Sequence, residues 1–175
     1  HMGRLFEEAA DEESAARAGE PDAFAHLRTL RLAISATGEY TAFFGSQANA
    51  QAAIVTTVNR MNQVYERDTQ LRFLLVANNI NVVFPNAATD PYSGGGTTTL
   101  MNTCRDQLIA AFTNGGFDIG HLVDQGGSGG IAGAIGNACV NTVSNAHKGR
   151  GYTSRPAPVG DPWDIDYVAH ELGHK

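Results

Sequence analysis

The sequence predicts an α/β fold, in which helices pack against a parallel sheet. Short apolar runs typical of strands alternate with longer segments of helical periodicity. The resulting strand-helix-strand order favours parallel pairing of the strands. With 175 residues, of which 42% are hydrophobic and 17% charged, the chain is long enough to bury a core of its own. We therefore expect one globular domain.

The first 20 residues differ in composition from the rest. Residues 3–20 carry six acidic and two basic side chains, and His1-Met2 is typical of a cloning remnant. We interpret residues 1–20 as a tag remnant followed by an acidic linker or propeptide remainder, and residues 21–175 as the domain. This domain is nearly neutral, which argues against a nucleic-acid or anionic-membrane surface. No apolar run approaches the roughly 20 residues of a membrane span, and no signal peptide is present.

Four segments make up the first half of the predicted domain. In residues 27–45, apolar residues alternate and predict a half-buried strand (Leu30, Leu32 and Ile34). Ser46 or Asn49 then caps an amphipathic helix of about five turns, whose apolar residues are Ile54, Val58, Met61 and Tyr65. The dense apolar run 71–79 predicts a buried strand, and residues 81–85 extend it or pair beside it.

A second helix and a third strand follow a loop. Residues 86–96 are rich in turn formers, and Thr97 to Thr99 cap a helix that residues 114–116 end. Its buried stripe is predicted to consist of Leu100, Cys104, Leu108 and Phe112, so Cys104 is expected to be a small core residue. Residues 117–124 predict the third strand, and a glycine-rich segment follows it.

The last helix carries the clearest start signal. Asp161 is the predicted N-cap and Pro162 the first helical residue. Ile165, Val168 and Leu172 would line the face that packs on the core. His170 and His174 are four residues apart, so their side chains project about 40° apart around the axis and lie one turn above the other.

This His-Glu-x-x-His spacing suits a zinc ion. Two imidazoles one turn apart can reach one metal at roughly 2.0–2.1 Å, and Glu171 is placed to exchange protons with an activated water. With six histidines among 175 residues, the pattern has a chance probability of about 0.01. We therefore predict a zinc site in which His170 and His174 are ligands and Glu171 is the base of an amide hydrolysis.

The other histidines lack ligand spacing. His121 lies in a strand-like run and is expected to be a hydrogen-bonded core residue. His147 lies beside Lys148 in a polar segment and is expected to be solvated, as is His26. Asp118 precedes the third strand and is expected to be a cap or turn acceptor.

Six segments of the chain resemble the metzincin metallopeptidases, and within them the bacterial reprolysin-like (adamalysin-like) family. They are RLAISATGEYTAFFG, VNRMNQVYERD, LLVANN, NAATDPY, FDIGHLVDQGGSGGIAGAIGNAC and GDPWDIDYVAHELGH, spread from about Leu30 to His174. The resemblance implies the amino-terminal subdomain of the catalytic domain, with a twisted, mostly parallel sheet and an antiparallel edge strand. It also implies zinc at His170 and His174, catalysis by Glu171, protein or peptide substrates and secretion.

The resemblance assigns a role to the glycine-rich segment and to Cys139. Gly129, Gly130, Ile131, Ala132 and Gly133 would form an edge strand that pairs with extended substrate, since small residues allow close approach of a peptide backbone. A flexible loop is the alternative, because glycine weakens strands. Cys139 would pair with a cysteine of the carboxy-terminal subdomain, while pairing with Cys104 stays open.

The chain departs from the family pattern at its end. Family members continue with a glycine and a third histidine ligand, whereas this sequence ends at Lys175. We expect the third ligand to lie in a carboxy-terminal subdomain and the last turn of the helix, with His174, to fray for lack of a cap. Two other functions stay open: a binding or adhesion module with an incomplete zinc site, and a thermolysin-like peptidase whose third ligand is a distant glutamate.

Overall fold

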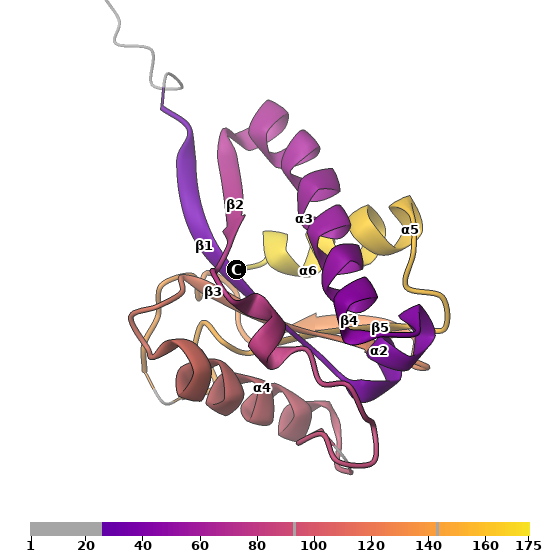
Figure 1. The fold of residues 1–175 in the computed structure, drawn as a ribbon. Helices are drawn as coiled ribbons and strands as arrows, with labels where there is room; N and C mark the ends of the chain where they lie inside the picture. Colours follow the sequence, from indigo (N-terminus) through magenta and orange to yellow (C-terminus); the bar gives the residue numbers. More distant parts are fainter. Residues whose placement is uncertain (1–25, 93, 143) are drawn as a thin grey trace, which may run out of the picture.

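A single sheet with the strand order β2-β1-β3-β5-β4 runs through the part of the chain that the computed structural model describes, residues 26–92, 94–142 and 144–175 (Figure 1). The strands are β1 (Arg28–Ala36), β2 (Leu71–Leu75), β3 (Ile119–Gln125), β4 (Gly129–Ala132) and β5 (Gly151–Arg155). β2, β1, β3 and β5 are parallel to one another, and β4 pairs antiparallel with β5. The predicted mostly parallel sheet with an antiparallel edge strand is therefore confirmed. Residues 1–20, interpreted as tag and linker, lie outside the described residues.

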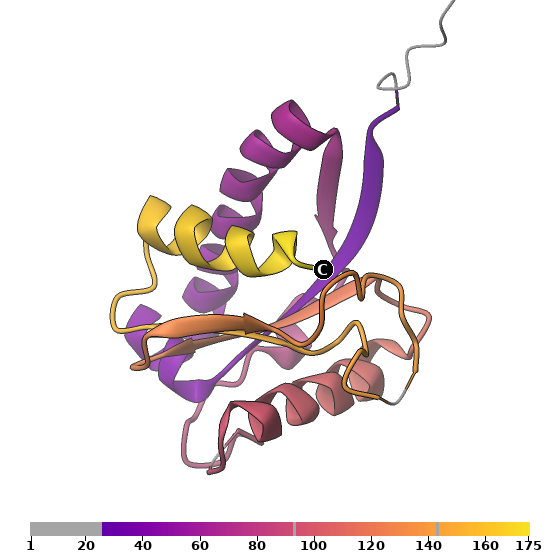
Figure 2. The ribbon, with the colours of Figure 1, turned by 180° about the vertical axis from the view of Figure 1, so that it is seen from behind.

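Helices cover both faces of the sheet. α3 (Gln47–Thr69) lies on one face together with a C-terminal helical segment, which consists of α5 (Asp161–Trp163), η2 (Asp164–Ala169) and α6 (His170–Gly173). α4 (Thr97–Phe112) covers the other face, as the two opposite views show (Figures 1 and 2). Each face has its own cluster of buried apolar side chains. The fold therefore has three layers, with the C-terminal helical segment crossing above the β4 and β5 side of the sheet.

β1 has the predicted alternation of faces, but it is not half-buried as expected, because residues 32–36 are buried on both faces. Leu32 and Ile34 join the core under α3, whereas Ala33 faces the α4 side. The second half of the predicted segment 27–45 is not a strand but the helix α2 (Gly38–Phe44), which sequence analysis missed. The Thr37 hydroxyl caps this helix by accepting a hydrogen bond from Tyr40 N, and Gly45 ends it at φ 81°.

α3 and α4 form largely where they were predicted. Ser46 is the N-cap of α3 and accepts a hydrogen bond from Asn49 N, but the helix has 23 residues and is longer than the five turns expected. α4 begins at Thr97, its N-cap is Gly96 rather than a threonine, and Cys104 is fully buried as predicted.

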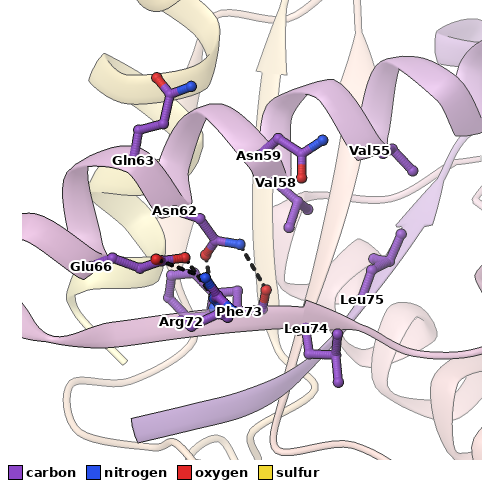
Figure 3. A pocket seen from close by; sticks show the side chains of 10 residues that line it. All are labelled: Val55, Val58, Asn59, Asn62, Gln63, Glu66, Arg72, Phe73, Leu74 and Leu75. Carbon is purple, nitrogen blue, oxygen red and sulfur yellow. Dashed lines mark hydrogen bonds and ion pairs between the residues drawn. The ribbon is translucent and has the colours of Figure 1, made fainter. Parts of the chain in front are cut away.

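β2 is an edge strand and not the buried strand that its apolar run predicted. Its Leu74 is 57% exposed, because β2 pairs only with β1. The outer side of β2 is covered at one point by Asn62 of α3, whose side-chain amide donates to Phe73 O at 2.9 Å and accepts from Phe73 N at 2.8 Å (Figure 3). This side chain occupies the backbone groups that another strand would use.

Residues 81–85 do not extend β2. A 3₁₀ turn, η1 (Asn79–Val82), follows β2, and Val83 then forms a parallel bridge with Ala36. β5 was missed altogether, because its five residues follow a polar loop and contain few apolar side chains.

Candidate metal centre

The C-terminal helical segment begins one residue earlier than predicted. Its N-cap is Gly160, at φ 71° and ψ −178°, a conformation that favours glycine. Asp161 is not the cap: its carboxylate forms a two-point ion pair with Arg60 of α3, with contacts of 2.7 and 2.8 Å. The predicted cap therefore ties the segment to α3.

The middle of the segment is a π-helix, which periodicity alone did not reveal. η2 spans Asp164–Ala169, between the start of the segment and the histidine pair. Asp164 is buried within it and accepts a hydrogen bond from Thr57 of α3 at 2.6 Å. Burial raises the pKa of the Asp164 carboxyl, and the Thr57 hydrogen bond partly opposes this shift. Val168 and Leu172 are buried as predicted, whereas Ile165 is only partly covered. Wide turns of this kind occur often at functional sites.

His170 and His174 meet as the spacing predicts. Both side chains are exposed, and their Nε2 atoms are 3.1 Å apart. Two nitrogens that bind one tetrahedral zinc ion at 2.0–2.1 Å lie about 3.3 Å from each other. The separation of the two nitrogens is therefore close to that of a zinc-bound pair.

Glu171 lies between the helix and the edge strand β4. The residue is 8% exposed, and a Cβ built at Gly130 would be 2.6 Å from its Oε1 atom. Gly130 therefore faces Glu171, while its neighbour Ile131 is 43% exposed and pairs with Tyr152 of β5. The sheet edge predicted to bind substrate and the predicted base are thus brought together.

The end of the helical segment is held in place, contrary to the expected fraying. Gly136 N donates to His174 O at 2.8 Å, and Ala138 N donates to Lys175 O at 3.0 Å. The Lys175 ammonium donates to the carbonyl oxygens of Gly120, Lys148 and Arg150 at 2.8 to 3.2 Å. Burial of the Lys175 ammonium lowers its pKa to about 7. The glycine-rich loop after β4 supplies the cap that the sequence pattern did not show.

Two of the other expectations for polar residues are confirmed. His121 is fully buried in β3, and its Nε2 lies 2.8 Å from Thr153 Oγ1. Asp118 was expected to be a cap or turn acceptor, but it accepts hydrogen bonds from the backbone N–H and the guanidinium of Arg31 in β1, which lowers the pKa of its carboxyl. His26 was expected to be solvated and is exposed.

His147 was predicted wrongly. It is fully buried rather than solvated, because Gly149 N donates to its Nδ1 and its Nε2 lies 2.9 Å from Asn114 Oδ1. The loop around it folds back onto the end of α4. Neutral imidazole suits this pattern, with the Nε2 proton donated to Asn114.

The cysteines do not pair with each other. Cys104 belongs to α4 and is buried, whereas Cys139 is exposed, and both cysteines are free. The pairing left open between them is therefore absent from the fold, and the partner expected for Cys139 stays a prediction.

Within the described residues, no cluster of three or more His, Cys, Asp or Glu side chains could hold a metal ion. Among these residues, the pair His170 and His174 therefore has no third such side chain beside it. A cavity of about 460 Å³ opens beside His170, lined by residues of α3 and of the helical segment that include Tyr65 and Ile165. A second cavity of about 440 Å³ lies between α3 and β2, at the edge of the sheet opposite β4 (Figure 3).

No helix among the described residues is both long and apolar enough to span a membrane.

The fold and the helix together define a class. A mostly parallel sheet with an antiparallel edge strand, lying beside a His-Glu-x-x-His helix, is the architecture of the metzincin amino-terminal subdomain. The family model described as metallo-peptidase family M12B, reprolysin-like, matches residues 26–175. The chain therefore belongs to the reprolysin-like M12B metallopeptidases. A search of curated proteins finds no match.

Proposed function

We propose that the chain is the amino-terminal part of a zinc-dependent endopeptidase, with His170 and His174 as metal ligands and Glu171 as general base. The observation that carries the proposal is the 3.1 Å separation of the two Nε2 atoms on the turn that also carries Glu171. Family membership supports peptide hydrolysis in general. Membership also favours the metzincin type of site over the thermolysin-like alternative.

The chemistry divides between the metal and the protein. Bound zinc would supply Lewis acidity for the water and the scissile carbonyl. Glu171 would accept a proton from the attacking water and deliver it to the leaving amine. Its burial against β4 keeps bulk water away from the carboxylate. His170 and His174 would be held at chelating distance by the capped end of the helical segment.

Substrate would bind along β4. This strand is at the edge of the sheet, and no other described strand pairs with its outer side, which would leave that side to an extended peptide. Gly129, Gly130, Ile131, Ala132 and Gly133 would form this subsite, and the missing side chain of Gly130 lets Glu171 pack directly against the strand. Main-chain pairing accepts many sequences, which suits a protein or peptide substrate. Secretion is proposed on the resemblance alone.

A complete site requires a third protein ligand, which we expect from a carboxy-terminal subdomain. A second candidate function is a peptide-binding module without catalysis. The observation that favours it is the two-ligand character of the site among the described residues. In that case β4 would still bind extended peptides, and Glu171 would have no chemical role.

The test compares Glu171→Gln with Glu66→Gln in a protein that contains this chain and the third ligand. Glu66 pairs with Arg72 beside β2, at the opposite edge of the sheet, and serves as the matched control. We expect Glu171→Gln to retain zinc and to lose hydrolysis of an internally quenched peptide, while the control retains both. Retained turnover in Glu171→Gln would remove this residue from the mechanism. Peptide capture without hydrolysis by the unmodified protein would favour the binding module.

A further inference from the structure

The hydroxyl of Tyr65 reaches from α3 to the C-terminal helical segment. It donates a hydrogen bond to Ala169 O at 2.7 Å, and Ala169 directly precedes His170. The tyrosine ring packs edge-on against Phe73, with a centroid distance of 4.9 Å, so the phenol has little freedom to leave. Burial also raises the pKa of Tyr65, which keeps the hydroxyl protonated as a donor.

The same hydroxyl lies against Gly173, the residue before His174. A Cβ built on Gly173 would be 2.9 Å from Tyr65 Oη, closer than real Cβ contacts allow. Gly173 has no left-handed backbone angle, so its conformation does not require glycine. Space for the Tyr65 hydroxyl is therefore the structural reason for glycine at this position.

One oxygen atom thus contacts the helix next to both members of the histidine pair. The hydrogen bond holds the carbonyl before His170, and the hydroxyl occupies the space that a Cβ would need at Gly173, before His174. Tyr65 of α3 therefore lies against both ends of the turn that separates the two imidazoles. A shift of either contact would change the 3.1 Å separation of the Nε2 atoms.

We propose that Tyr65 is a positioning residue for the His170–His174 pair, and that Gly173 is its required partner. The assignment of the pair to a metal rests on the function proposed above, but the contact between Tyr65 and Gly173 does not. Tyr65 was recognised from the sequence only as an apolar stripe residue of α3. The presence of a tyrosine in that apolar stripe could have predicted its hydrogen bond, since a half-buried phenol usually finds a hydrogen-bond partner.

The experiment is a double-mutant cycle with Tyr65→Phe, Gly173→Ala and both together in the 175-residue chain. Thermal unfolding and zinc titration are measured for each variant. Tyr92→Phe is the matched control, because its hydroxyl is also hydrogen-bonded, to Ser35 at 2.6 Å, but on the α4 side of the sheet. The control should lower the melting temperature without changing the zinc dissociation constant.

We expect Tyr65→Phe to weaken zinc binding roughly tenfold, the effect typical of losing a group that orients a ligand. Gly173→Ala should weaken zinc binding similarly and lower the melting temperature by about 3 °C. In the double variant the alanine methyl occupies the space of the lost hydroxyl. Its melting temperature should then equal or exceed that of Tyr65→Phe, since alanine is the better helix former.

Additive effects in the cycle, together with an unchanged zinc dissociation constant for Tyr65→Phe, would overturn the proposal. If the unmodified chain binds no zinc, that result concerns the function proposed above and not the contact between Tyr65 and Gly173. The positioning is then measured by the nuclear Overhauser effect between the rings of His170 and His174, whose centroids are 4.7 Å apart. Tyr65→Phe should weaken this signal, and an unchanged signal with additive melting temperatures would refute the positioning role.

Discussion

The Cα atom of Gly130 lies directly against the side chain of Glu171: a Cβ added at Gly130 would be 2.5 Å from Glu171 Cγ. The edge strand and the helix of the candidate site are therefore packed to the limit that glycine allows. This contact joins the two features that sequence analysis assigned separately, to substrate and to catalysis. It also makes the position of Glu171 sensitive to a single methyl group.

Gly130→Ala tests this contact. The methyl must displace either β4 or Glu171, which we expect to cost about 1–3 kcal/mol of stability. In a protein with the complete catalytic domain, peptide hydrolysis should fall at least about tenfold through misplacement of the carboxylate. Gly115→Ala is the control, since a Cβ there meets nothing within 4 Å. Equal melting temperatures and rates for the two variants would show that the contact has no consequence.

Stability should fall on mild acidification because of buried histidines. Burial and the nearby cations Arg105, Lys148 and Lys175 lower the pKa of His147 from 6.5 to about 4, and burial lowers that of His121 in the same direction. The unfolded chain then binds protons more readily than the folded one. This contribution to stability is complete above pH 6.5 and is lost progressively as the pH falls from 6.5 towards 4.

Thermal unfolding between pH 8 and pH 4 measures this effect. The melting temperature should decline below about pH 6.5, and His147→Gln should make the decline shallower. His26→Gln is the control, since His26 is exposed, and its profile should match that of the unmodified chain. A melting temperature that stays constant or rises on acidification to pH 4.5 would contradict the account.

Asn62→Ala should destabilise the free edge of the sheet. The variant removes two hydrogen bonds to the Phe73 backbone, for an expected loss of about 1–2 kcal/mol. It also uncovers backbone groups beside the exposed Leu74, so the chain should self-associate more. Melting temperature and light scattering after size exclusion measure the two effects. Asn59→Ala is the control. Asn59 lines the cavity between α3 and β2 together with Asn62, and its variant should show neither the lower melting temperature nor the self-association (Figure 3).

Most of the fold was predictable because periodicity and caps are local signals. The alternation of β1, the Ser46 cap of α3 and the stripe of α4 were all recognised. β2 was misjudged as buried because its apolar run does not show how many strands pair with it. β5 was missed because few of its five residues are apolar, so its strand character depends on pairing with β3 and β4.

The candidate site was predictable only where the chemistry lies in adjacent residues. The pair His170 and His174 depends on a spacing of four, which a helix turns into proximity. The contacts that hold the pair come from distant parts of the chain: Tyr65 from α3, and the loop after β4 that caps His174. The π-helix and the burial of His147 likewise depend on tertiary packing, which no local pattern encodes.

Zinc titration of the 175-residue chain by calorimetry at neutral pH tests the central claim most directly. We predict one-to-one binding with a dissociation constant of about 1 μM or weaker, since two imidazoles leave the coordination incomplete. Glu171→Gln should bind equally well, while His174→Ala should lose binding at least about tenfold. Zinc binding that His174→Ala leaves unchanged would contradict the assignment of the metal to this pair.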